Sequence, residues 1–130
     1  KLFAPEVIAD RRPGRGRCAV ALRLKPNQDF RSALEAVADR FAINHARICG
    51  GVGSLIGADF DDGTVVGNFA TEVLITRGAI TRDGNGAPQS SIEVAMVDYT
   101  QALASGILTK NANSVLMTFE LVLEILEQQT

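Results

Sequence analysis

The sequence predicts an α+β fold in which a β-sheet carries one main amphipathic helix, residues 29–42. Three observations support it: one segment has the hydrophobic spacing of a helix, several have strand composition, and Asp83–Gly86 is typical of a hairpin turn. The chain has 130 residues, of which 46% are hydrophobic, enough for one buried core in a single domain, residues 17–126. No apolar run reaches the roughly 18 residues of a membrane helix, so we expect a soluble, cytoplasmic protein.

Residues 1–16 are predicted to be a flexible arm, because prolines and glycines interrupt them. Four arginines cluster where the arm meets the domain: Arg11, Arg12, Arg15 and Arg17. Arg15-Gly16-Arg17 resembles the core of an AT-hook, which lies in the minor groove of A·T-rich DNA, although Cys18 follows here in place of proline. The formal net charge is −2, so any contact with DNA is expected to be local. The alternative interpretation is a solvated arm.

The first strand is expected at Cys18–Leu24, followed by a turn at Lys25–Gln28. The helix follows this turn, because apolar residues recur there at the spacing of one helix face. They are Phe30, Ala33, Leu34, Val37, Ala38 and Phe41. Asn27 or Asp29 is expected to cap the first turn of the helix. The two phenylalanines are predicted to lie in the core.

Glycines interrupt the strand-like run that begins at Ile43. Ile43–Cys49 and Leu55–Phe60 both have strand composition, so the glycines between them indicate a tight turn, a bulge or an edge that faces a ligand. A phosphate-binding loop needs a helix after the glycines, and a strand is predicted there instead. We therefore favour a structural bend, with Ser54 at its mouth.

The second half of the chain is predicted to be mostly strands. Thr71–Thr76 has strand composition, and the hairpin at Asp83–Gly86 leads into the next strand. That strand, Ser90–Val97, has Ile92, Val94 and Met96 on one face and Ser91, Glu93 and Ala95 on the other, more polar face. Leu103–Leu108 is expected to be a short strand, and residues 117–125 a long one because apolar residues alternate there with period 2. Residues 127–130 are expected to be a frayed end.

Several side chains that often carry chemistry lack suitable neighbours. His45 is the only histidine, and Cys18 and Cys49 lack metal-ligand spacing, so both cysteines are predicted to be buried free thiols. Asp59–Gly63 is rich in aspartate but lacks the spaced ligands of a calcium loop, which favours an acidic turn. No nucleophile with a general base stands out. We therefore predict no catalytic residue and no cofactor.

Three segments stand in an informative order along the chain. They are Leu22–Phe30 with the helix that follows it, Gly51–Leu55 and Thr71–Ile75. Together they resemble the plants-and-prokaryotes-conserved domain, abbreviated PPC, over about residues 17–126. The resemblance implies a largely antiparallel, twisted sheet on which the helix packs, and a homotrimer. In plants this domain is joined to AT-hooks in nuclear DNA-associated proteins, and bacterial relatives are named as candidate DNA-binding proteins.

Many prokaryotic members of this family carry a His-x-His pair and a later Gly-Gly-His, a trio that can hold a metal. The resemblance places these three positions on Ser91, Glu93 and Ile107, so none of them is a histidine here. The metal site is therefore predicted to be lost. Glu72 matches a glutamate on one of the family's strands, where it either lines a pocket or is a buried structural residue.

Three functions are consistent with this sequence. The first is a non-enzymatic, trimeric DNA-associated or regulatory module, in which the four arginines of each chain become twelve in a trimer. The second is a small-molecule binder or weak enzyme with a pocket between subunits. The lining predicted for that pocket is Gly51, Gly53, Ser54, Glu72, Ser91 and Glu93. The third is an assembly protein whose strands mainly make the trimer interface.

Overall fold

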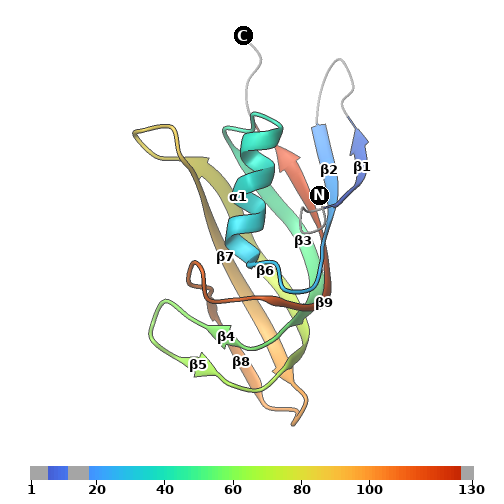
Figure 1. The fold of residues 1–130 in the computed structure, drawn as a ribbon, viewed down its shortest axis with the longest axis vertical. Helices are drawn as coiled ribbons and strands as arrows, with labels where there is room; N and C mark the ends of the chain where they lie inside the picture. The colour runs from blue at the N-terminus through green and yellow to red at the C-terminus, as the bar shows by residue number, and fades with distance from the viewer. Residues whose placement is uncertain (1–5, 12–17, 127–130) are drawn as a thin grey trace.

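The computed structural model describes residues 6–11 and 18–126, and its main feature is a seven-stranded sheet (Figure 1). Its strands are β1 (Glu6–Arg11), β2 (Cys18–Leu24), β3 (Ala46–Leu55), β6 (Ala70–Arg82), β7 (Pro88–Asp98), β8 (Leu103–Ile107) and β9 (Val115–Ile125). They lie in the order β1-β2-β9-β3-β6-β7-β8, and every neighbouring pair is antiparallel. A separate short pair is formed by β4 (Ala58–Asp59) and β5 (Val65–Val66). The predicted α+β class with a largely antiparallel sheet is confirmed.

Helix α1 (Phe30–Arg40) packs across one face of the sheet, as Figure 1 shows. It begins at Asp29, whose carboxylate accepts a hydrogen bond from the backbone N–H of Ser32 at 3.1 Å, so Asp29 is the predicted cap. The predicted apolar stripe is buried except for Phe41, which is half-buried against the core. The ring of Phe30 meets that of Phe119 on β9 edge to face, with centroids 4.5 Å apart. The helix therefore anchors on the centre of the sheet.

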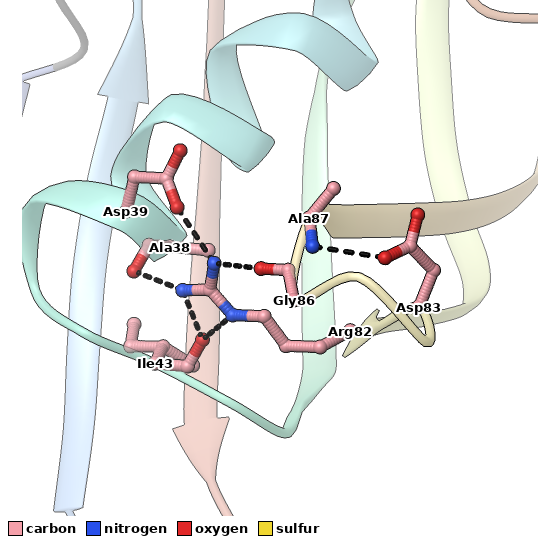
Figure 2. Close-up of polar contacts among 7 residues, drawn as sticks. All are labelled: Ala38, Asp39, Ile43, Arg82, Asp83, Gly86 and Ala87. Atoms are coloured by element: carbon pink, nitrogen blue, oxygen red, sulfur yellow. Dashed lines mark hydrogen bonds and ion pairs between the residues drawn. The ribbon is translucent and has the colours of Figure 1, made fainter.

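The C-terminal end of α1 is held by an arginine from β6. Ala42 has a φ of +53°, and the N–H of Ile43 donates to the carbonyl of Ala38 at 2.8 Å, which closes the last turn of the helix. The guanidinium of Arg82 then donates to the carbonyls of Ile43, Ala38 and Gly86 at 2.8, 3.0 and 3.1 Å and to the carboxylate of Asp39 at 2.6 Å (Figure 2). One side chain thus joins the end of the helix to the β6–β7 hairpin.

The glycine stretch lies within one continuous strand. Of the three predicted alternatives the bulge is observed, whereas the prediction of a turn or bend between two strands is wrong. Strand β3 runs through it, and the pairing register with β9 shifts twice, which marks β-bulges. A Cβ atom on Gly51 would lie 2.7 Å from the Cβ of Leu121, and one on Gly53 would lie 2.6 Å from the Cα of Phe119. These glycines are needed because β9 comes too close for any side chain.

Two further differences from the sequence analysis concern the first strands. Glu6–Arg11 forms β1, which pairs with β2, where the sequence indicated an arm without secondary structure. Cys18 is half-buried and Cys49 is exposed, so the prediction that both thiols are buried is wrong. Cys49 lies in the first bulge of β3, between the paired residues Ile48 and Gly50, and its side chain is exposed.

The strands of the second half agree closely with the predicted pattern. β6 and β7 form the predicted hairpin, and the carboxylate of Asp83 accepts hydrogen bonds from two N–H groups of its turn. On β7 the side chains of Ile92, Val94 and Met96 are buried, whereas Ser91 is exposed and Glu93 half-buried. The final strand, β9, is a single long strand as its period of 2 indicates. Among the described residues no helix is long and apolar enough to cross a membrane.

Asp98 closes the turn between β7 and β8. Its Oδ1 atom accepts hydrogen bonds from the hydroxyl and N–H of Thr100 at 2.6 and 2.8 Å, and its Oδ2 accepts one from the side chain of Asn68 at 3.1 Å. The hydroxyl of Thr100, and then the amide of Asn68, lower the pKa of this carboxyl from 3.8 to about 2. The ionised form of Asp98 is therefore the form that the folded turn requires.

Asp98→Asn is expected to lower the free energy of unfolding near neutral pH, because the amide imitates a protonated carboxyl. Because the pKa of Asp98 is lower in the folded state than in the unfolded state, its ionised carboxylate stabilises the fold at pH values above about 4. This stabilisation is lost as the pH falls from about 4 to about 2. The difference in free energy of unfolding between wild type and Asp98→Asn should therefore become smaller over that pH range. Urea titrations at a series of pH values measure it, and a gap that stays constant down to about pH 2 would contradict this assignment.

Candidate functional site

The sheet has one covered and one open face. The covered face carries α1 and, at the other end, the β4–β5 pair, whose neighbour Phe60 packs on Gly106 of β8. We call the opposite surface the open face. Five large apolar side chains on it are exposed to solvent: Val52, Leu74, Leu103, Ile107 and Val122. Apolar side chains gathered in this way on one face mark a surface that makes contacts.

Two grooves cross the open face. The larger, of about 710 Å³, lies over β6, β7 and β8 and has mainly apolar walls, including Leu74 and Leu103. The smaller, of about 370 Å³, lies between β3 and the start of β9 and includes Met117. Val52 and Glu72 line both grooves. Glu72 is therefore a carboxylate placed between two hydrophobic walls.

The structure brings together only part of the predicted ligand pocket. Gly53, Ser54 and Glu72 all line the smaller groove. The hydroxyl of Ser54 is buried and accepts a hydrogen bond from the N–H of Met117 at 3.0 Å, so it has a structural partner already. Glu72 is exposed, so of the two interpretations of this residue the pocket lining agrees with the structure and the buried structural role does not.

The other three predicted pocket residues lie elsewhere. Gly51 is directed toward the core, since a Cβ atom there would meet Leu121 and Ile75. Ser91 and Glu93 lie on the open face of β7, but beyond the described lining of either groove. The six residues therefore do not form one site within a single chain.

Charged side chains on the open face form cross-strand pairs of arginine and glutamate. Arg23 of β2 lies opposite Glu120 of β9 and contacts it at 3.1 Å. Arg47 of β3 lies opposite Glu124 of β9 and contacts it at 2.8 Å. The hydrogen bond to Glu124 raises the pKa of Arg47 above its ordinary value. Both pairs lie on the half of the face formed by β2, β9 and β3.

A third arginine and glutamate lie opposite each other on neighbouring strands but form no ion pair in the described part of the chain. Arg77 of β6 lies directly opposite Glu93 of β7, yet no ion pair joins them within residues 18–126. The register of β6 shifts between Ile75 and Arg77, which marks a β-bulge next to the arginine. Leu74 and Arg77 were not singled out from the sequence. Leu74 could have been, because it alternates out of phase with the buried Val73 and Ile75.

The positions that the resemblance assigned to a metal trio are neighbours in space. Glu93 of β7 lies directly opposite Ile107 of β8, and Ser91 is two residues away on the same face. Their side chains offer one carboxylate, one hydroxyl and one aliphatic group, which do not fit a site built for three imidazoles. Across the described ranges, no three His, Cys, Asp or Glu side chains are grouped closely enough to hold a metal ion.

The predicted nucleic-acid-binding cluster lies mostly outside the described residues. This applies to Arg12, Arg15 and Arg17, whereas Arg11 is the last residue of β1. The backbone of Arg11 pairs with Ala19 of β2 at one edge of the sheet. The cluster is therefore attached at the edge opposite to β8.

Comparisons with known proteins agree with this fold. The family model of the Plants and Prokaryotes Conserved (PCC) domain, the family abbreviated PPC above, matches residues 11–127. A search of curated proteins returns no significant match.

Three solved structures illustrate the similarity in three dimensions. A PPC protein from Pyrococcus horikoshii has a TM-score of 0.64 and 15% identity, covering 94% of this chain and 83% of its own. A candidate DNA-binding protein from Bacteroides thetaiotaomicron has a TM-score of 0.66 and 13% identity, covering 93% and 85%. A metal-containing protein from Archaeoglobus fulgidus has a TM-score of 0.62 and 19% identity, covering 100% and 88%. At such identities the likeness concerns the fold alone.

Proposed function

Because the chain belongs to the Plants and Prokaryotes Conserved domain family, we propose that it is a non-enzymatic, homotrimeric module that associates with DNA. In this proposal the domain assembles through the open face of its sheet. The basic cluster at Arg11, Arg12, Arg15 and Arg17 contacts the duplex.

The observation that carries the proposal is the apolar character of the open face. Leu103 is 84% exposed and Leu74 54%, and both lie on the open face of the sheet. A solvated sheet face normally alternates to polar residues, and large apolar side chains cost free energy in water. Burial between subunits removes that cost, which supports an oligomer.

Support for DNA comes from the sequence and from relatives. Four arginines lie within seven residues of a chain that is otherwise slightly acidic. Their attachment at the β1–β2 edge leaves the open face available for assembly. A structurally similar protein from Bacteroides thetaiotaomicron is named as a candidate DNA-binding protein. Gathering several arms on one assembly raises the local concentration of positive charge, which strengthens contact with phosphates.

A second candidate function, binding of a small molecule between subunits, is favoured by the position of Glu72. Its carboxylate lies between two grooves with apolar walls, an arrangement that suits a ligand with a cationic group and an apolar body. Because both grooves are open, a neighbouring subunit would have to supply the missing wall. This function becomes the leading one if the chain fails to bind DNA.

Replacing Arg15 and Arg17 together with alanine is expected to weaken binding to a labelled duplex at least about tenfold, because two phosphate contacts are lost. For wild type, raising the salt from about 50 mM to about 200 mM should weaken binding about 100-fold if some four phosphates are neutralised. Fluorescence anisotropy with A·T-rich and G·C-rich duplexes measures both effects. The matched control is Lys25→Ala/Arg40→Ala, which removes the same charge from the folded domain outside the open face and should leave binding nearly unchanged.

A further inference from the structure

We propose that Asn85 is a site of spontaneous deamidation and that Arg82 slows this reaction by holding the β6–β7 hairpin closed. Asn85 is the only asparagine of the sequence that is followed by glycine. It is exposed at the tip of the hairpin, and apart from the chain neighbours of Gly86, no atom of the described residues lies within 4 Å of the position of a Cβ atom on that glycine. The tip is therefore open to water, and Gly86 has no side chain that would crowd an attack by its backbone nitrogen.

The reaction needs only this chain and water. The backbone nitrogen of Gly86 attacks the Cγ atom of Asn85, so that a new bond forms between them while the bond from Cγ to the side-chain nitrogen breaks. The attacking nitrogen loses its proton and the leaving nitrogen takes one up, which releases ammonia and leaves a cyclic imide. Water then opens the ring at either of its carbonyl groups. The product is aspartate, or isoaspartate, whose backbone runs through the former side chain and is longer by a methylene group.

The closed hairpin opposes this attack. The N–H of Gly86 donates to the carbonyl of Asp83 at 3.0 Å, so the proton that has to leave is engaged in a hydrogen bond. The carbonyl of Gly86 accepts a hydrogen bond from the guanidinium of Arg82 at 3.1 Å (Figure 2). The same guanidinium also donates to the carbonyls of Ala38 and Ile43. Gly86 is thus held by its own turn and by the end of α1, and the reaction requires local opening of the hairpin.

The two products should affect the fold differently. Isoaspartate lengthens the backbone directly before Gly86, which displaces the carbonyl that Arg82 contacts. It also disturbs the base of the turn, where the N–H of Asp83 donates to the carbonyl of Ala87 at 3.0 Å. Aspartate keeps the backbone unchanged and only adds a negative charge at an exposed position. Isoaspartate is therefore the product that weakens the attachment of the hairpin to the end of α1.

Ageing of the purified full chain at alkaline pH tests the proposal, because the attacking nitrogen has to lose a proton. Peptide mass spectrometry follows the replacement of NH2 by OH at Asn85 over time and separates isoaspartate from aspartate. Wild type is compared with Arg82→Met. Asp39→Asn is the matched control, since it removes another partner of Arg82 but leaves the hydrogen bond to Gly86 in place. Asn111, which precedes alanine, serves as a reference within each sample.

We expect Asn85 to react at least about fivefold faster in Arg82→Met than in wild type, and within about twofold of wild type in Asp39→Asn, because the rate follows the population of the open hairpin. Circular dichroism checks that the variants are folded. Wild type in urea should react at least about tenfold faster than folded wild type, which measures the protection even if Arg82→Met does not fold. Aged wild type that contains isoaspartate should unfold at a lower urea concentration than Asn85→Asp, which has the same charge and a normal backbone.

Two results would overturn the proposal. If Asn85 in folded wild type is modified no faster than Asn111, or not at all, the hairpin is not a deamidation site. If folded wild type reacts as fast as wild type in urea, or as fast as folded Arg82→Met, the network around Arg82 does not control the reaction.

Discussion

Arg82→Met is expected to lower the free energy of unfolding by about 3 kcal/mol. The guanidinium of Arg82 donates to the backbone carbonyls of Ala38 and Ile43, where α1 ends, and to that of Gly86 in the hairpin. The side chain is only 18% exposed, so water cannot fully replace the donors that methionine lacks. The carbonyl of Ala38 keeps the N–H of Ile43 as a donor, but the buried Ile43 loses both Arg82 donors to its carbonyl. Hydrogen bonds from a charged group contribute about 1.5–3 kcal/mol each.

Two further variants separate the parts of this network. Arg82→Lys keeps the charge beside Asp39, but a single ammonium cannot reach three carbonyls in different directions, so it should lose most of the same stability. Asp39→Asn removes only an ion pair whose carboxylate is 62% exposed, and it should cost less than about 1 kcal/mol. Urea unfolding of the three variants gives the order. Equal losses for Asp39→Asn and Arg82→Met would mean that the ion pair, and not the carbonyl network, stabilises the end of α1.

Gly53→Ala is expected to lower the free energy of unfolding by about 3 kcal/mol or more. The new Cβ atom would collide with the carbonyl oxygen of Thr118 and lie 2.6 Å from the Cα of Phe119. Both are backbone atoms of β9, the strand next to β3, so relief requires the two strands to separate. The ring of Phe119, which packs on Phe30 of the helix, would be displaced as well.

Gly84→Ala is the matched control for this substitution. A Cβ atom on Gly84, in the β6–β7 hairpin, would meet no atom within 4 Å, so alanine there should be neutral or slightly stabilising. Thermal and urea unfolding compare the two variants. If Gly53→Ala is as stable as Gly84→Ala, the close approach of β9 to β3 does not exist in solution.

The elements that could be predicted from the sequence are those whose pattern is local. Helix α1 follows from the spacing of its apolar residues and from Asp29 at its start. The period of 2 in β7 and β9 places Ile92 and Phe119 in the core. The hairpin at Asp83 follows from its turn residues alone. In each case the deciding contacts are close in the sequence.

The course of the glycine stretch through one continuous strand was not predicted, because its reason lies far away in the chain. Positions 51 and 53 require glycine because Leu121 and Phe119 of β9 lie where a side chain would be. A sequence displays the freedom of a glycine to turn, but not the neighbour that excludes its side chain. For the same reason the role of Arg82 was not predicted, since it depends on carbonyl groups about 40 residues away.

The candidate site could be predicted only in outline. The alternation on β7 correctly placed Ser91 and Glu93 on the face away from the core. The sequence did not indicate that these residues lie outside the grooves around Glu72, nor that Glu93 lies opposite Arg77. Both facts depend on the register between strands and on the bulge in β6, which follow from pairing over the whole sheet.

The duplex titration at two salt concentrations tests the central claim, association with DNA through the basic cluster, most directly. We expect binding that weakens steeply with salt and weakens again in Arg15→Ala/Arg17→Ala, while Lys25→Ala/Arg40→Ala binds like wild type. Anisotropy that stays flat at about 50 mM salt for A·T-rich and G·C-rich duplexes alike would contradict it. The function would then lie in the grooves beside Glu72.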